Sequence, residues 1–416
     1  MRKPWSISTT VRNPERFRDF LRVLKQLEGQ SFDTSNQIKY QVLLIKERIY
    51  KPLNIPIDYL KYYEEPETEI PYKVAEQIFI MQKYEDPPMR GRQSVNPLNK
   101  LGFSIAREGY GPIIITELGN KFLSDDYEIG YIFFKSLLKL QFPNPWSANF
   151  SEKEGFDIMP LIAVMKLIKK INGEAEKKGL DKNEFNLFVP TLIKFDQVDE
   201  YVQRILEFRK AKNKDEYINN FAKMFYQTTT IPANKINNLF DYGDNIMRYF
   251  RLTRYFKVSM DPLGSNWIID LEPSRKVEIE QLLDMYKGAS IKFETVTDYL
   301  NYLSYIEQPL LPWEKRDNLE KVVQTLKYDT NNLIKEGKLQ ISQEQQTFLD
   351  MEIHDLDKNQ LEKYKDQIRA FNLELKERIK KVKLMSDLNK VEEIIVTLQD
   401  IKKLREFQKD GHYLQI

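Results

Sequence analysis

The sequence predicts a mainly α-helical protein with small β-wings, and three observations support this fold class. Residues 92–123 place an alternating apolar pattern with two glycines between two segments of helical period. Residues 244–273 repeat that order. Residues 311–416 are polar and helical in period, with a single glycine between Trp313 and the last few residues. Because helix, hairpin, helix is the order of a winged helix, we expect tandem winged-helix-like subdomains followed by an all-helical linker domain.

The N-terminal segment combines a strand signal with a well-specified helix start. Trp5, Ile7, Thr9 and Val11 occupy alternate positions, which predicts a short strand. Asn13-Pro14-Glu15 supplies an N-cap, a proline at the first helical position and an acid in the first turn. Arg12 belongs to a group of arginines around this helix that could hold phosphates or form its solvated face. The expected helix has one apolar stripe and ends at a glycine: Phe17, Phe20, Leu21, Leu24, Leu27 and Gly29.

The next segments set the predicted domain boundaries. The period predicts helices over about 37–50 and 71–84, a loop over 85–93, and a strongly apolar helix over 127–141. The proline- and glycine-bearing stretch 142–156 is the clearest internal boundary. We therefore expect a first winged-helix-like subdomain over 1–125, a second over 126–310, and a helical linker domain over 311–416.

The stretch 92–123 is the main candidate for contact with double-stranded DNA. Apolar residues alternate up to a turn at Gly109 and Gly111 and again beyond it, after a short helix that begins at Pro97, and Thr116 can cap the helix that follows. In a winged helix, the helix before the wing usually lies in the major groove and the wing touches the backbone. The alternative is a packing unit with a solvated polar face. The candidate DNA-binding residues here are Arg90, Arg92, Gln93, Asn96, Asn99, Lys100 and Arg107, whose side chains can bond base edges or phosphates.

A second unit of the same kind is expected after residue 150. Helices over 158–171, 181–195 and 201–208 precede a polar insertion at 209–240. A helix ending at Leu252, a strand over 255–258, a turn at 261–266 and a strand over 267–269 then predict a second wing. Arg248, Arg251 and Arg254 recur every three residues, so we expect a shared helical face that meets phosphates. Ion pairing with Asp241, Asp244 or Glu272 is the alternative.

Composition excludes several classes of protein. The 416 residues are 41% hydrophobic and 12% aromatic, which is enough for the cores of several domains. The 64 basic and 62 acidic residues give a net charge of +2, so any surface for nucleic acid must come from local segregation of charge. The absence of cysteine excludes disulfides, and the two histidines, His354 and His412, disfavour zinc. We expect no membrane span and a cytoplasmic location.

A search for catalytic motifs gives no active site. A restriction-type nuclease needs an aspartate and an E-x-K element on neighbouring strands, so that carboxylates hold Mg²⁺. Glu176-Lys177-Lys178 and Glu374-Leu375-Lys376 match the spacing, but both lie in expected helical or loop segments without a preceding buried strand. We interpret both as chance matches and expect no catalytic residue, no metal site and no cofactor in this chain.

Several motifs together resemble the AlwI-type family of type IIS restriction endonucleases and their nicking relatives. The resemblance runs in order over about residues 4–400. Its motifs are R-N-P-E-R-F, R-Q-S-V-N-P-L-N-K-L-G-F, I-I-I-T-E-L-G-N-K-F-L, L-L-K-L-Q-F-P, D-x-V-D-E-Y-V-x-R-I-L-E-F-R and R-Y-F-R-L-T-R-Y-F.

The resemblance implies DNA recognition by winged-helix-like subdomains, a helical linker, and a C-terminal Mg²⁺-dependent PD-(D/E)xK nuclease domain that cuts outside a short asymmetric site. The chain is expected to end where the linker leads to that domain, so a separate nuclease domain or subunit, with Mg²⁺, is the further partner implied besides double-stranded DNA. The recognition positions implied are Arg92, the junction Lys100-Leu101-Gly102-Phe103, Arg248 and Arg251. A non-enzymatic winged-helix DNA-binding protein, such as a replication initiator or transcriptional regulator, remains the alternative function.

Overall fold

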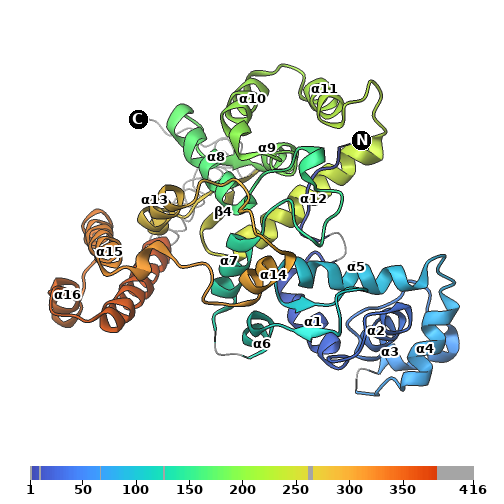
Figure 1. The fold of residues 1–416 in the computed structure, drawn as a ribbon. Coiled ribbons are helices and arrows are strands. Elements are labelled where there is room, and N and C mark those ends of the chain that lie inside the picture. The colour runs from blue at the N-terminus through green and yellow to red at the C-terminus, as the bar shows by residue number, and fades with distance from the viewer. Residues whose placement is uncertain (1, 9–10, 66, 125–126, 261–265, 382–416) are drawn as a thin grey trace, which may run out of the picture. The chain divides into compact units, whose positions relative to one another are not determined.

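The computed structural model describes residues 2–8, 11–65, 67–124, 127–260 and 266–381, which form two compact units, Met1–Leu311 and Pro312–Ile416. The described residues are mostly helical with two small sheets (Figure 1), so the predicted mainly α class with small β elements is confirmed. The predicted boundary between the first two subdomains, at residues 125 and 126, lies outside the described residues. No helix of the described part is long and apolar enough to cross a membrane.

The first part of the chain is a group of helices closed by a hairpin. Asn13 caps the first turn as predicted, because its side chain accepts a hydrogen bond from the Glu15 amide at 3.1 Å. The Thr116 hydroxyl likewise accepts from the Gly119 amide at 2.9 Å and caps α6. The elements are η1 Pro14–Arg16, α1 Phe17–Lys25, α2 Thr34–Lys46, η2 Ile57–Tyr59, α3 Lys61–Glu64, α4 Tyr72–Met81, α5 Pro87–Lys100, β1 Ser104–Ile105, β2 Ile114–Ile115 and α6 Glu117–Leu123.

The hairpin predicted around the two glycines is present. Ser104 pairs with Ile115 and Ile105 with Ile114 in an antiparallel ladder. Phe103 below it is fully buried, and its ring stacks on Phe122 at a centroid distance of 4.6 Å. The hairpin is therefore held on the core by its apolar face.

Two predictions for this part were wrong. The segment at Trp5 is not a strand in its described residues, and Thr9 lies outside them. Trp5 instead donates through its backbone amide to the Pro190 carbonyl and through its indole to the Leu192 carbonyl, so isolated contacts replace a strand ladder. Residues 87–93 are helix rather than loop, because Asp86 caps α5 and Pro97 removes only one helical N–H donor inside it.

The second part packs helices around a three-stranded antiparallel sheet of order β3-β5-β4. The second predicted hairpin is present as β4 and β5, and its turn at 261–265 lies outside the described residues. The elements are α7 Ile129–Lys139, η3 Glu152–Glu154, α8 Pro160–Glu174, β3 Leu180–Asp181, α9 Lys182–Phe188, η4 Phe195–Gln197, α10 Val198–Lys210, α11 Lys214–Tyr226, α12 Ala233–Leu252, β4 Phe256–Met260, β5 Trp267–Leu271, η5 Pro273–Arg275, α13 Lys276–Met285 and α14 Val296–Ser304.

The stretch predicted as a polar insertion, 209–240, is largely helical. The stretch contains α11 and the start of α12. The Asn213 side chain caps α11 by accepting from the Glu216 amide at 3.1 Å, and Phe221 and Phe225 bury one face of the helix. The short β3 strand was not predicted, because two residues are too few to show the alternation of apolar and polar residues that indicates a strand.

The C-terminal unit is helical in its described part. It contains η6 Pro312–Glu314, α15 Arg316–Glu336, α16 Gln343–Asp350 and a helix over 358–381. Leu349, Phe371 and Leu375 form its buried cluster. The helical period of the sequence also predicts an antiparallel hairpin between 361–384 and 391–407. Its first arm is helix up to residue 381, and its second arm lies outside the described residues.

Candidate nucleic-acid interface

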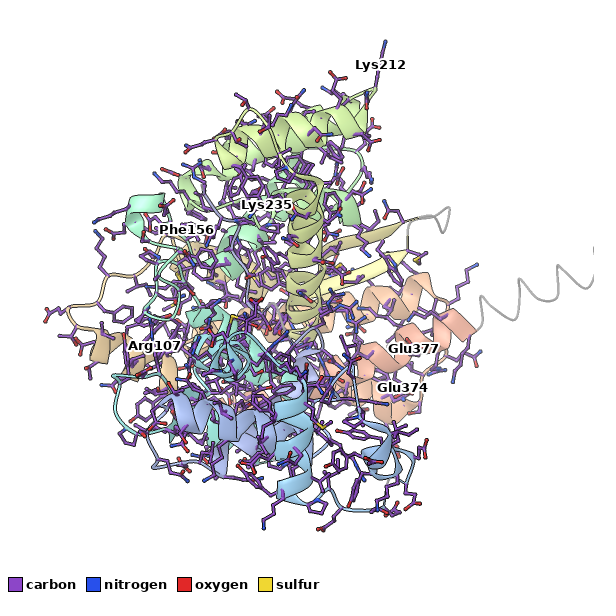
Figure 2. All side chains as sticks on the ribbon, turned by 90° about the vertical axis from the view of Figure 1, so that its right-hand side faces the viewer. Arg107, Phe156, Lys212, Lys235, Glu374 and Glu377 are labelled. Atoms are coloured by element: carbon purple, nitrogen blue, oxygen red, sulfur yellow. The ribbon has the colours of Figure 1, made fainter. Side chains whose placement is uncertain are left out.

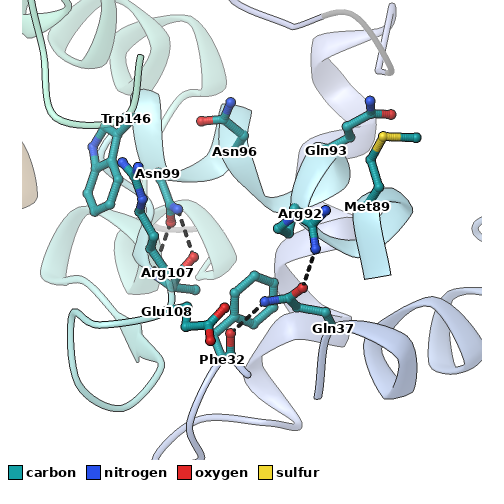
Figure 3. A pocket seen from close by; sticks show the side chains of 11 residues that line it. Phe32, Gln37, Met89, Arg92, Gln93, Asn96, Asn99, Arg107, Glu108 and Trp146 are labelled. Carbon is teal, nitrogen blue, oxygen red and sulfur yellow. Dashed lines mark hydrogen bonds between the residues drawn. The ribbon is translucent and has the colours of Figure 1, made fainter. Parts of the chain in front are cut away.

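A cleft of about 350 Å³ lies between α5, the start of α2 and the β1–β2 hairpin (Figure 3). It brings together five of the predicted DNA-binding residues, which come from α5 and the hairpin: Arg92, Gln93, Asn96, Asn99 and Arg107. The full lining is Phe32, Gln37, Met89, Arg92, Gln93, Asn96, Asn99, Ala106, Arg107, Glu108 and Trp146. Most of these side chains carry hydrogen-bond donors or acceptors, so the cleft can pair with a polar ligand edge.

Close packing of α5 on α2 forms one wall of the cleft. A Cβ atom on Gly91 would lie 2.3 Å from the Gln37 carbonyl oxygen, so only glycine allows this approach. The approach places the neighbouring Arg92 within reach of the buried Gln37 side chain. The sequence offers no signal for this contact, because the two residues belong to different helices.

Two hydrogen bonds hold the Arg92 guanidinium at the mouth of the cleft. Its Nη1 donates to Gln37 Oε1 at 2.9 Å, and its Nη2 donates to Asp86 Oδ2 at 2.7 Å. Gln37 is itself fixed by donating from Nε2 to the Phe32 carbonyl at 2.8 Å. Arg92 remains exposed, and its other N–H donors are available to an acceptor outside the protein. A guanidinium oriented in this way matches the acceptor pair of guanine or the oxygens of a phosphate.

Asn96 lies one helical turn beyond Arg92 on the same side of α5. Its side chain lines the cleft and is half-buried, and no hydrogen bond to another described residue involves it. A primary amide offers a donor and an acceptor side by side, which matches the major-groove edge of adenine. Gln93 carries the same group on the same wall, and Met89 adds an exposed apolar surface at the rim.

The opposite wall is the hairpin, and Asn99 fixes it to α5. Asn99 Nδ2 donates to the Ala106 carbonyl at 2.9 Å, while its Oδ1 accepts from the Ala106 amide and the Ser104 hydroxyl. Arg107 follows on the hairpin, where its guanidinium donates to the Pro145 carbonyl and lies 5.5 Å from the Tyr110 ring centroid. Arg107 is exposed and supplies the positive charge on this wall.

The structure corrects the prediction for Asn99 and Lys100. Both side chains are buried, with exposed fractions of 3% and 6%. Asn99 uses its amide to hold the hairpin, and Lys100 Nζ donates to the Ser6 carbonyl at 3.2 Å. Burial lowers the pKa of Lys100 to about 8. Both side chains are therefore engaged inside the protein, and Asn99 contributes to the cleft as a bonded part of its wall.

The remaining predicted arginines lie outside the cleft lining. Arg90 is exposed on α5 with its guanidinium 4.9 Å from the Tyr84 ring centroid. Arg12 is exposed and lies 3.6 Å from Asp241, a pair that in solvent contributes little to stability.

The expected face of three arginines is only partly present. Arg248 and Arg251 lie on α12, but the helix ends at Leu252, and Arg254 has a left-handed backbone with φ +62°. Arg248 pairs with Asp244 at 3.0 Å and Arg254 with Glu128 at 3.0 Å. Arg251 is exposed and has no ion pair among the described residues. Of the three, Arg251 is therefore the side chain most available to a phosphate.

No metal centre is formed in the part of the chain that the structure describes, where no group of at least three acidic or histidine side chains gathers. Glu176 and Lys178 lie in a turn before β3, and Glu374 and Lys376 lie in the helix over 358–381. The described residues therefore do not fit the Mg²⁺ that the family resemblance implies, and we derive no step through it.

Sequence reasoning missed two residues that shape the cleft. Gln37 was assigned only to a helix, and Trp146 only to a boundary stretch. Trp146 is buried against Tyr110, at a centroid distance of 5.4 Å, and its indole N–H has no hydrogen-bond partner among the described residues. For Trp146, the only available signal in the sequence was its place next to the polar Ser147, in a stretch rich in proline and glycine.

Comparison with known proteins identifies the family. No curated protein matches the chain. Nine chains of solved structures match, among them the crystal structure of pyrene- and phenanthrene-modified DNA in complex with the BpuJ1 endonuclease binding domain. That chain is 12% identical, with a TM-score of 0.43, over 73% of this chain and 96% of its own. The model of the AlwI restriction endonuclease family matches residues 99–410, a span that includes the hairpin, α12 and both sheets. The chain therefore belongs to the AlwI restriction endonuclease family.

Proposed function

We propose that this chain recognises a specific sequence of double-stranded DNA, as the N-terminal part of a type IIS restriction or nicking endonuclease in a restriction–modification system. The observation that carries the proposal is the cleft beside α5, which is lined by Arg92, Gln93 and Asn96 on the helix and by Arg107 on the hairpin. Arginine pairs with guanine and the amides pair with adenine in the major groove. Membership of the AlwI restriction endonuclease family supports the assignment to an endonuclease.

The proposed docking is winged-helix-like. The α5 helix enters the major groove, which is wide enough for a helix, and the β1–β2 hairpin with Arg107 lies against the backbone. The fixed Arg92 guanidinium then meets a base edge without a large loss of side-chain freedom, because Asp86 and Gln37 already orient it. A second contact is made by α12 and the β4–β5 hairpin, with Arg251 on a phosphate.

Cleavage is proposed to require Mg²⁺ and a PD-(D/E)xK nuclease domain or subunit beyond the described residues. The described part supplies positioning on DNA rather than hydrolysis, since its acidic residues do not gather into a metal site.

Selection of bound duplexes from a randomised library tests the recognition directly. We expect one short asymmetric sequence to be enriched, and enrichment of none would refute sequence-specific recognition. Incubation of supercoiled plasmid with the 416-residue chain and Mg²⁺ tests whether cleavage requires a nuclease domain or subunit besides this chain. We expect no nicking, and nicking that a chelator abolishes would show that this chain carries its own nuclease centre.

A further inference from the structure

A second cleft, of about 370 Å³, shares no lining residue with the α5 cleft and is assembled from distant parts of the chain. Its walls come from the N-terminal segment, the turn at 149–150, the end of α11 and the first turns of α12. The lining is Arg2, Lys3, Pro4, Ser6, Asn149, Phe150, Tyr226, Lys235, Asn238 and Tyr242. Nothing in the base-reading role of α5 uses this cleft.

The charge of the second cleft is one-sided. Arg2, Lys3 and Lys235 contribute three positive charges, and no aspartate or glutamate lines the cleft. Lys3 Nζ donates to the neutral Asn149 side chain at 3.1 Å. None of the three cations has an ion pair with a described carboxylate, although the chain as a whole is nearly neutral. A concave surface with charge of one sign concentrates ions of the opposite sign.

A fourth cation lies behind the wall. Lys100, at the end of α5, is buried, and its Nζ donates to the carbonyl of Ser6 at 3.2 Å and lies 5.6 Å from the Phe150 ring centroid. Both of these residues line the second cleft. A buried ammonium without a carboxylate partner is costly, and here its pKa is lowered to about 8 by burial. An anion in the cleft would supply the missing counter-charge.

The neutral groups of the cleft are suited to oxygen acceptors. Burial raises the pKa of Tyr242, so its phenol stays protonated and can donate near neutral pH. The Tyr226 hydroxyl donates to the Lys235 carbonyl at 3.3 Å and so holds the first turn of α12 against the end of α11. Asn238 adds an amide on α12. Several cations combined with neutral donors form the arrangement that binds the oxygens of a phosphate group.

We propose that the second cleft binds a phosphate group, presented either by the backbone of duplex DNA or by a free phosphate-bearing molecule. Lys235 and Arg2 contact its oxygens directly, and Lys100 responds to its charge from behind the wall. The DNA source rests on the proposed function, whereas phosphate binding as such does not.

The test compares two charge-matched variants of the full chain. Lys235→Gln removes a cleft cation, and Lys212→Gln removes an exposed lysine on the loop before α11, away from Lys235 (Figure 2). Inorganic phosphate is titrated calorimetrically at constant ionic strength, with chloride as the reference anion. We expect saturable binding to the wild type and to Lys212→Gln, and a loss of about tenfold or more in Lys235→Gln.

Proton uptake on binding gives a second readout, which a partly unfolded variant would not produce. At pH 8.5 an anion in the cleft should raise the pKa of Lys100, so binding should take up protons, detectable as a dependence of the heat on the buffer. Lys100→Met should bind without this uptake.

Binding of a non-specific duplex then separates the two sources. Weakening by Lys235→Gln and not by Lys212→Gln assigns the cleft to the DNA backbone, whereas an effect on inorganic phosphate alone assigns it to a free molecule. The proposal is overturned if phosphate binds no better than chloride and the two variants bind duplex equally. Specific DNA binding that persists in that case would leave the proposed function intact.

Discussion

Replacing Asn96 by alanine separates base reading from structural roles at the α5 cleft. The Asn96 side chain lines the cleft and makes no hydrogen bond to another described residue, so its removal leaves no buried group unpaired. Because alanine is the better helix former, Asn96→Ala should raise the free energy of unfolding slightly, by about 0.5 kcal/mol. A loss of DNA binding in this variant cannot then be ascribed to unfolding.

The expected loss follows from the bonds that the amide can make. An asparagine that bonds an adenine edge contributes about 1–3 kcal/mol to discrimination, which is about 5-fold to 150-fold in affinity. Random DNA should be bound almost as well as before, since the amide contributes little to phosphate attraction. The base pair that Asn96 reads should become tolerant of substitution while the others keep their preferences.

The assay measures affinity for the selected duplex and a scrambled duplex at one fixed salt concentration. Asn220→Ala is the matched control, because Asn220 is an exposed asparagine inside α11 without a hydrogen-bond partner among the described residues. Equal losses on both duplexes, or a loss no larger than that of Asn220→Ala, would refute base reading by Asn96.

Three further predictions follow from the same contacts. Arg251→Ala should weaken the binding of specific and non-specific DNA about equally and make the salt slope shallower by about one unit. Arg248→Ala, which also removes the pair with Asp244, should change the affinity less. Relaxed discrimination at one base pair would reassign Arg251 to base reading. Asp86→Ala should lower the free energy of unfolding by about 1 kcal/mol in urea titration, because α5 loses its cap, and an equal effect of the exposed Glu85→Ala would contradict this. Burial chiefly, together with the Lys135 charge, lowers the pKa of Lys139 to about 7. The unfolded chain therefore binds a proton that the folded chain lacks above pH 7, so stability should rise from pH 7 to pH 9 by up to about 1.4 kcal/mol per pH unit from this residue. Lys139→Met should show a shallower rise, and an unchanged pH dependence would show that the folded lysine titrates normally.

The sequence by itself determined the elements whose causes are local. Asn13 and Thr116 cap helices where predicted, because an N-cap bond joins residues two or three positions apart. The hairpin between Phe103 and Ile115 formed because alternation and two turn glycines specify one buried face. The candidate residues Arg92, Gln93, Asn96 and Arg107 were found in the same way, from residue type and from their place beside the hairpin.

Only the tertiary structure decided what those residues can reach. Asn99 and Lys100 share the residue types and the helix of the candidates, yet packing buries them, and no periodicity distinguishes them from Asn96. The bond from Arg92 to Gln37 spans 55 residues and depends on the close approach at Gly91. The second cleft joins Lys3 to Lys235 across most of the first unit. Such contacts depend on how the helices pack against one another. The free energy of this packing is distributed over many apolar residues and is not determined by any one motif.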